Sequence, residues 1–173
     1  MRHEHIERIL KLAAAVMVAL TFGAAEAAAQ RRIVASLTDR KLVLMDGNRV
    51  VKVYDTAVGK PSTPSPAGSY TVVAKVANPV YRAHKQDVPP GPNNPVGTRW
   101  IGLSVKGYGI HGTNAPKSIG RAASHGCIRM RNKDVEELFE LVQVGVPVEL
   151  RDGPLTEVQG APATVQSTKV SAD

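Results

Sequence analysis

The sequence predicts a mainly β domain that carries one principal α-helix. Between residues 33 and 151, short runs rich in β-branched residues are separated by turn signals such as Asp39-Arg40 and Gly47-Asn48, a pattern typical of hairpins. Only one segment, residues 132–144, spaces its apolar residues as an amphipathic helix does. The chain of 173 residues has a length typical of one domain.

The predicted strands are residues 33–38, 41–46, 49–59, 68–76, 98–105, 108–111 and 146–151. In the fourth of these, alternation places Tyr70, Val72 and Ala74 on one face of the strand. Residues 60–68 precede it and hold three prolines, so we expect a fixed turn there. Residues 77–95 hold five prolines, and such a long irregular segment is either a lid over a site or a solvated excursion.

The predicted helix, residues 132–144, carries one apolar stripe. Its apolar residues fall at i, i+3, i+4 and i+7, and they are Val135, Leu138, Phe139 and Val142. This stripe is expected to lie on the sheet. Asn132 is the expected N-cap, and Gly145 is expected just beyond the C-terminal end of the helix.

Both ends of the chain are predicted to lie outside the domain. Residues 1–29 combine a basic start, an apolar run and small-x-small cleavage patterns, as in a secretory signal peptide. An uncleaved anchor is disfavoured because Glu26 follows a short run, and a spanning helix needs about 20 apolar residues. Residues 152–173, rich in Pro, Thr, Ser and Ala, are expected to form a disordered tail. Residues 31–151 would then suffice for an active domain in the periplasm or cell envelope.

The net charge of the chain is +7, and residues 1–29 contribute equal numbers of acidic and basic side chains. A basic excess in an exported protein suggests an anionic partner. Nucleic acid fits poorly, because the chain has two Phe, one Trp and four Tyr and no basic run interleaved with aromatic residues. A cell-wall polymer rich in carboxylates fits the charge better, although the charge alone does not select it.

The chemistry is concentrated in residues 111–130, HGTNAPKSIGRAASHGCIRM. This stretch holds the only cysteine, Cys127, together with His111 and His125. Cysteines of secreted domains are commonly paired in disulfides, and Cys127 has no partner in the chain. A thiol attacks as the thiolate and therefore needs a base or a positive field. Cys127 is a candidate nucleophile; the alternative, a small buried hydrophobic residue, is disfavoured by the adjoining His-Gly.

The residues alone leave the identity of the base open. His125 and Cys127 would point the same way in an extended segment, whereas nothing in the spacing brings His111 to Cys127. These three side chains could also ligate zinc, but their spacing matches no common zinc pattern, so no metal is expected. A papain-like protease is excluded because the order of cysteine and histidine is reversed.

The segment closely resembles the active-site signature of the L,D-transpeptidases with a YkuD-type catalytic domain, a His-Gly followed by Ser-His-Gly-Cys. Residues 63–70 (TPSPAGSY), 94–103 (NPVGTRWIGL) and 132–150 (NKDVEELFELVQVGVPVEL) resemble other parts of the family in the same order. The resemblance covers nearly all of the predicted domain. It implies a YkuD-like β-sandwich of mixed sheets with one principal α-helix.

The resemblance also implies roles for the site residues. Cys127 would be the nucleophile and His111 the base, with the imidazole oriented by the carbonyl of Gly112. His125 would then shape the site or contact substrate.

Further roles are expected around the nucleophile. The amides of Gly126 and Cys127 are candidates for an oxyanion hole, Gly126 would allow close approach of a substrate, and Ser124 would hydrogen-bond within the turn. Arg129 would share a face with Cys127 on a strand, where it would either bind a substrate carboxylate or be a solvated arginine.

The implied function is that of an L,D-transpeptidase of cell-wall biogenesis and cell shape. It would act as a monomer without a cofactor, with peptidoglycan stem peptides as donor and acceptor. The enzyme would release D-Ala from a tetrapeptide stem as it forms a thioester, then transfer the acyl group to an amine and form a 3→3 cross-link. Two alternatives stay open: an L,D-carboxypeptidase, in which water resolves the thioester, and a non-catalytic wall-binding module.

Overall fold

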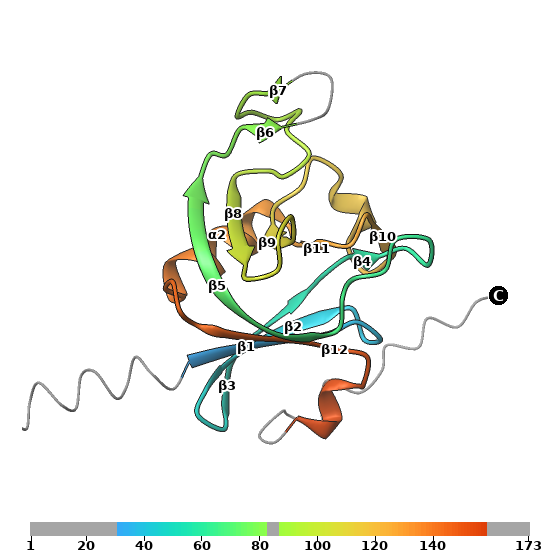
Figure 1. Cartoon of the computed structure of the whole chain (residues 1–173), viewed down its shortest axis with the longest axis vertical. Coiled ribbons are helices and arrows are strands. Elements are labelled where there is room, and N and C mark those ends of the chain that lie inside the picture. The colour runs from blue at the N-terminus through green and yellow to red at the C-terminus, as the bar shows by residue number, and fades with distance from the viewer. Residues whose placement is uncertain (1–30, 83–86, 159–173) are drawn as a thin grey trace, which may run out of the picture.

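The computed structural model describes residues 31–82 and 87–158, and within these ranges the chain is mainly β with one α-helix (Figure 1). The strands are β1 (Arg31–Ser36), β2 (Lys41–Asp46), β3 (Arg49–Asp55), β4 (Val58–Gly59), β5 (Gly68–Ala77), β6 (Tyr81–Arg82), β7 (Asp87–Val88), β8 (Arg99–Leu103), β9 (Gly109–His111), β10 (Ala122–Ser124), β11 (Ile128–Arg129) and β12 (Pro147–Arg151). The helical elements are α2 (Asn132–Leu141) and the 3-10 turns η1 (Pro116–Ser118) and η2 (Leu155–Glu157). The predicted fold class is therefore confirmed.

Eight strands form one mixed sheet in the order β11-β9-β8-β5-β12-β1-β2-β3. Two neighbouring pairs, β1 with β12 and β9 with β11, run parallel, and the other pairs run antiparallel. The first residues of β5 pair with β12, whereas its residues from Val72 onward pair with β8, with a register shift between Val72 and Ala74. The sheet curls along β5 (Figure 1), so one continuous sheet forms both layers of the predicted sandwich.

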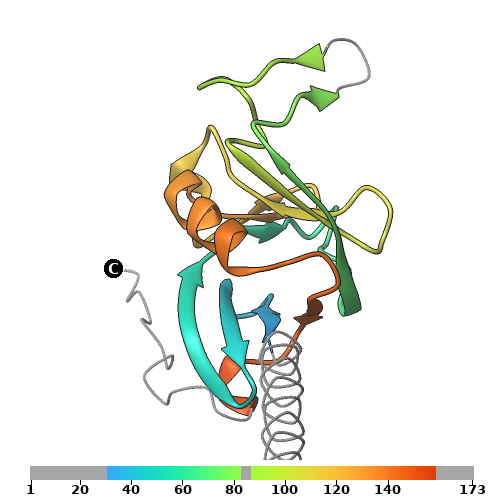
Figure 2. The ribbon, with the colours of Figure 1, turned by 90° about the vertical axis from the view of Figure 1, so that its left-hand side faces the viewer.

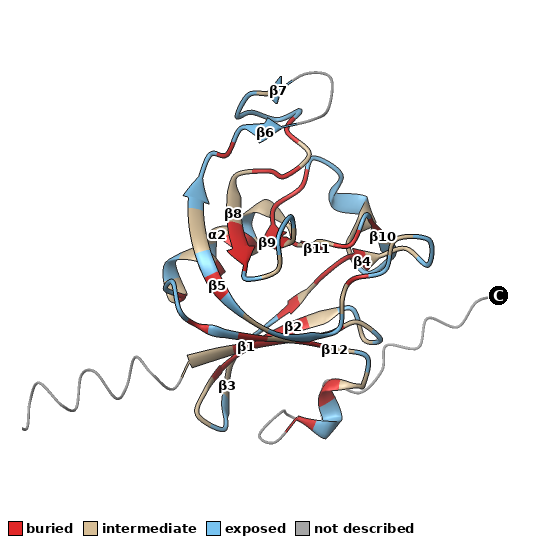
Figure 3. Cartoon of the chain, viewed as in Figure 1, coloured by how far each residue is buried: buried red, intermediate tan, exposed pale blue. Residues whose placement is uncertain are grey.

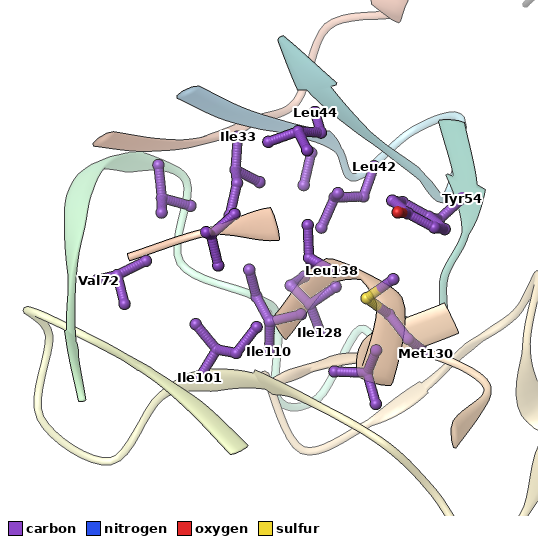
Figure 4. Close-up of a cluster of buried hydrophobic side chains, with 14 of the residues drawn as sticks. Ile33, Leu42, Leu44, Tyr54, Val72, Ile101, Ile110, Ile128, Met130 and Leu138 are labelled. Atoms are coloured by element: carbon purple, nitrogen blue, oxygen red, sulfur yellow. The ribbon is translucent and has the colours of Figure 1, made fainter. Parts of the chain in front are cut away.

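The main core fills the space between the two halves of this curled sheet (Figure 4). Its fully buried side chains from β1, β2, β8, β9, β11 and α2 include Ile33, Leu42, Leu44, Ile101, Ile110, Ile128 and Leu138. Burying one such aliphatic side chain contributes about 1.5–3 kcal/mol to stability. The core thus fixes the backs of β8, β9 and β11, whose ends carry the candidate site.

Helix α2 packs on the sheet (Figure 2) through the predicted apolar stripe, since Val135, Leu138 and Val142 are buried. Its ends differ from the prediction. The N-cap is Arg131, and the helix ends at Leu141 because Val142 is extended. Gly145, with φ +94, donates its N–H to the Val72 carbonyl at 2.8 Å, so it pins the chain to β5 on the way to β12 and does not close the helix.

The segment that follows β12 also differs from the prediction. Residues 152–158 pack on the domain: Leu155 is fully buried and Val158 is 5% exposed. Together with Val34, Val43 and Met45 they form a second apolar cluster, on the face of β1 and β2 opposite the main core. The polar composition of the segment did not predict this packing, because only two apolar side chains are needed to cover that face. The rest of the predicted tail, 159–173, and the predicted signal peptide, 1–29, lie outside the described residues.

The hairpin of β6 and β7 extends from one end of the molecule (Figure 2), and its side chains are largely exposed (Figure 3). Below it, the strands around the site are mostly buried. Within residues 31–82 and 87–158, no helix has the length and apolar character needed to cross a membrane.

Ending the chain after Asp152 should destabilise the domain by about 2–5 kcal/mol, because the loss of Leu155 and Val158 uncovers Val34, Val43 and Met45. Thermal and urea unfolding would measure the loss. A chain ending at Val158 should match the full chain, and Leu155→Ala should reproduce much of the effect. Equal melting temperatures for the chains ending at Asp152 and Val158 would contradict this interpretation and support the boundary predicted from the sequence.

Candidate active site

The parallel pairing of β9 with β11 brings the predicted site residues together. His111 ends β9, and its register partner on β11 is Arg129. The Met130 N–H donates to the His111 carbonyl at 2.8 Å, which holds the two strand ends side by side. Cys127 immediately precedes β11. His111, Cys127 and Arg129 therefore line one pocket, together with Ser124 and His125.

This pocket has a volume of about 780 Å³. One wall comes from the proline-rich segment predicted as a lid or an excursion: Asn78, Pro79, Val80, Tyr81, Arg82 and Pro95 all line the pocket. Residues 78–82 and Pro95 of the segment therefore form a wall of the site. The lining includes the cations Arg82 and Arg129, and no aspartate or glutamate of the described residues contributes to it.

His111 is 4% exposed, and its Nδ1 lies 2.5 Å from the carbonyl oxygen of Gly112. Because a carbonyl only accepts hydrogen bonds, the ring proton is on Nδ1 and Nε2 is left as the acceptor. Burial lowers the pKa of His111 to about 4; the nearby charge of Arg129 lowers this pKa too, whereas the bond to Gly112 opposes the shift. The ring is thus neutral near pH 7, as a base must be.

Trp100 was not predicted as a site residue, yet its ring stacks on His111 with centroids 5.5 Å apart and planes 20° from parallel. The indole lies where two glycines leave room. A Cβ at Gly109 would come within 2.6 Å of it, and one at Gly102 within 3.0 Å. Glycines inside strands often mark such close approaches, so Gly102 and Gly109 were the available sequence signal.

The turn that carries Cys127 is closed by Ser124, as predicted. The buried Ser124 hydroxyl donates to the Cys127 carbonyl at 2.6 Å and accepts the Gly126 N–H at 3.0 Å. Gly126 has φ +115, and a Cβ there would lie 2.6 Å from the Tyr108 ring, so this position requires glycine. The close approach at Gly126 is therefore to Tyr108.

This turn leaves only one of the two amides that were predicted to form an oxyanion hole. The amide of Gly126 is already bonded to Ser124, so it is not free to bind an oxyanion. The amide of Cys127 donates to no group among the described residues. The Cys127 amide is thus the remaining candidate of the two.

Burial raises the pKa of the Cys127 thiol, whereas the backbone of Gly109 and the charge of Arg129 act in the opposite direction. The sulfur also lies 3.7 Å from the Gly107 carbonyl, which can accept the S–H. Together with the lowered pKa of His111, this favours a neutral thiol beside a neutral imidazole.

Arg129 is held by its backbone, which exchanges two hydrogen bonds of 2.9 Å with Ala57. Its buried Nε has no hydrogen-bond partner within residues 31–82 and 87–158, and no ion pair to it is found in the same ranges. His125 is exposed and lines the pocket. Among the described residues, no three His, Cys, Asp or Glu side chains are arranged to hold a metal ion.

Comparison with known proteins identifies the family. The model of the L,D-transpeptidase catalytic domain (YkuD) matches residues 30–150. The putative L,D-transpeptidase YqjB of Bacillus subtilis is 44% identical over 126 residues, which are 69% of this chain and 70% of that protein. The putative L,D-transpeptidase YkuD of the same species is 43% identical over 116 residues, 67% of this chain. The chain spans 63% of that relative, less than two thirds of its length.

Solved structures show the same fold. The NMR structure of the catalytic domain of the E. faecium L,D-transpeptidase has a TM-score of 0.58 at 26% identity, and the match covers 71% of this chain and 98% of that one. L,D-transpeptidase 3 of Mycobacterium tuberculosis, in complex with a faropenem-derived adduct, has a TM-score of 0.57 at 23% identity. That match covers 70% of this chain and 60% of the other.

A neutral resting pair predicts a simple pH dependence for alkylation of Cys127 by iodoacetamide. Because the pKa of the thiol is raised, the rate should climb about tenfold per pH unit between about pH 6 and 8, following the thiolate fraction. Arg129→Met should slow alkylation at each pH, since loss of the positive charge raises the pKa of the thiol further. Arg121→Met, an exposed arginine outside the pocket, is the matched control. A rate plateau below pH 7 would instead indicate a thiolate–imidazolium pair.

Proposed function

Because the chain belongs to the L,D-transpeptidase family, we propose that it is a cysteine acyltransferase acting on peptidoglycan stem peptides. The observation that supports this most directly is the shared pocket, to which β9 contributes His111 and the β11 segment contributes Cys127 and Arg129. A thiol, a base and a group that orients the base are the parts needed for covalent acyl transfer.

In the proposed acylation, Cys127 Sγ attacks the carbonyl carbon of the third residue of a tetrapeptide stem while His111 Nε2 takes the thiol proton. The Cys127 amide is the candidate donor to the developing oxyanion, and one such donor is worth roughly 10²–10³ in rate. Collapse of the tetrahedral intermediate breaks the bond to the terminal D-Ala. The leaving amine receives the proton from Nε2, and a thioester remains on Cys127.

In the proposed second step, the amine of another stem attacks the thioester. His111 Nε2 accepts a proton from that amine, and Sγ leaves and recovers a proton from the imidazolium. The product is a 3→3 cross-link and the free enzyme. The protein's own side chains supply every proton transfer, so the proposed cycle uses no cofactor.

The charge and polarity of the pocket suit these substrates. Stem peptides carry carboxylates, and Arg129 offers a guanidinium whose Nε has no partner among the described residues. Bidentate arginine–carboxylate pairing is the geometry expected for such a contact. Val80, Tyr81 and Trp100 add apolar surface to the pocket that Cys127 also lines. A site that excludes water and positions an amine favours transfer over hydrolysis.

The proposed setting is the periplasm or cell envelope, where peptidoglycan lies. It is supported by the signal-peptide pattern of residues 1–29 and by the net charge of +7, which suits a carboxylate-rich polymer. The proposed working form is a monomer. Its role would be in cell-wall biogenesis and cell shape.

A carbapenem tests the proposed nucleophile, because a β-lactam of the penem class gives an adduct with the M. tuberculosis relative. We expect the protein to gain one inhibitor mass in intact mass spectrometry, and Cys127→Ala to gain none. His111→Ala should slow acylation by about 10²–10⁴-fold through loss of general-base catalysis. The exposed His125 is the matched histidine, and His125→Ala should slow acylation far less.

Two results would contradict these roles. An adduct that persists in Cys127→Ala would exclude this thiol as the site of acylation. Slower acylation in His125→Ala than in His111→Ala would assign the base to His125.

The products formed from purified tetrapeptide muropeptides distinguish the possible functions. We expect 3→3 dimers as the main product and the tripeptide as the minor product, as measured by liquid chromatography with mass spectrometry. Tripeptide alone would establish the carboxypeptidase alternative. Binding of muropeptides without any turnover would favour a wall-binding module. Cys127→Ala, with the same fold but no thiol, is the control for each outcome.

A further inference from the structure

The peptide group between Gly112 and Thr113 is hydrogen-bonded at both of its ends. Its carbonyl oxygen accepts the His111 Nδ1–H at 2.5 Å. Its N–H, which belongs to Thr113, donates to Oδ1 of Asn132 at 3.0 Å. The group is planar and trans, so the C=O and N–H point in opposite directions. Fixing one end of the plane therefore fixes the direction of the other.

The Asn132 side chain reaches this peptide because two glycines leave a slot for it. A Cβ at Gly97 or at Gly112 would overlap Asn132 Oδ1. Gly97 also has φ +64, a backbone conformation that favours glycine. The Asn132 amide thus lies between two backbone segments that carry no side chain at these positions.

The start of helix α2 sets the position of Asn132. The preceding residue, Arg131, pairs with Asp55 of β3 and with Asp134, each at 3.4 Å. Val135 and Leu138 bury the same end of the helix in the core. Asn132 was expected to cap this helix, but its side chain makes no cap hydrogen bond there, because Arg131 is the N-cap residue. Its acceptor is used on the Gly112–Thr113 peptide instead.

We propose that Asn132 is a positioning residue for His111, acting through the Gly112–Thr113 peptide. By holding the Thr113 N–H, it aims the Gly112 carbonyl at Nδ1, keeps the ring proton there and leaves Nε2 free to take the Cys127 proton. In the absence of Asn132, the peptide beside Gly112 can rotate, because glycine restricts its backbone least. The inference rests on the proposed function, in which His111 is the base.

The arrangement parallels triads in which a third group orients the catalytic histidine. Here the third group is a backbone carbonyl, and the asparagine acts one hydrogen bond further away. A hydrogen bond accepted from the N–H of a peptide also strengthens its carbonyl as an acceptor. Asn132 thereby supports both the orientation and the tautomer of His111.

The tautomer can be measured directly by ¹⁵N NMR of the histidine rings in the labelled protein at pH 7. We expect His111 in the wild-type protein to be protonated at Nδ1. Asn132→Ala should give a mixture of tautomers, or the Nε2–H form, whereas Asn132→Asp keeps an oxygen acceptor at the same place and should retain Nδ1–H. Lys133→Ala, an exposed neighbour in the same helical turn, is the control and should leave the spectrum unchanged.

The rate of carbapenem acylation supplies a second measurement. Asn132→Ala should lower the limiting acylation rate constant by about 10- to 100-fold, the usual effect of removing a partner that orients a functional histidine. The inhibitor concentration giving half the limiting rate should stay the same, since Asn132 does not line the pocket. Asn132→Asp should restore most of the rate.

Three outcomes would overturn the inference. The first is a folded Asn132→Ala protein that keeps both the Nδ1–H tautomer and its rate. The second is a wild-type protein in which the His111 ring is protonated at Nε2. This measurement needs no variant, so it tests the inference even if Asn132→Ala fails to fold. The third is an Asn132→Asp protein as slow as Asn132→Ala, with the wild-type tautomer in both. Because the tautomer is read without turnover, failure of the proposed transferase function would be seen separately as a wild-type protein that is not acylated.

Discussion

The site depends on one backbone interaction, the parallel pairing of β9 with β11. This pairing aligns His111 with Arg129 and leaves Cys127 at the start of β11, beside the end of β9. Parallel neighbours need a long crossover connection, and here that connection is the segment that runs through η1 and β10. The Ile110 and Ile128 side chains anchor the same two strands in the core. Core packing thus fixes the ends of β9 and β11, which carry His111, Cys127 and Arg129.

Burial shifts the pKa values of the His111 and Cys127 side chains in opposite directions, but it favours the uncharged form of both. It lowers the pKa of His111 and raises the pKa of the Cys127 thiol, and each shift favours a neutral side chain. Arg129 lowers both pKa values, so it favours the thiolate while it disfavours the imidazolium. Both shifts favour an uncharged side chain, and a protonated thiol is less susceptible to oxidation than a thiolate.

Much of the site is shaped by positions that lack a side chain. Gly102 and Gly109 make room for the Trp100 ring that stacks on His111, and Gly126 makes room for Tyr108 beneath the Cys127 turn. Gly97 and Gly112 open the slot for Asn132. A Cβ at any of these five positions would meet a neighbouring atom at 3.0 Å or less. These five positions therefore leave no room for a side chain without movement of a neighbour.

The sequence by itself determined the features that depend on neighbouring residues: most strands, the apolar stripe of α2, the hydrogen-bonded turn at Ser124 and the position of the candidate nucleophile, Cys127. Alternation, helical spacing and short motifs encode these within a few residues. Only the tertiary structure decided that His111 and Cys127 share a pocket, that Trp100 stacks on the imidazole, that Asn132 bonds to the Thr113 amide instead of capping its helix, and that Leu155 covers the outer face of β1 and β2. These contacts join residues far apart in the chain, and they are created by the order of the strands in the sheet, which the periodicity of a single segment does not encode.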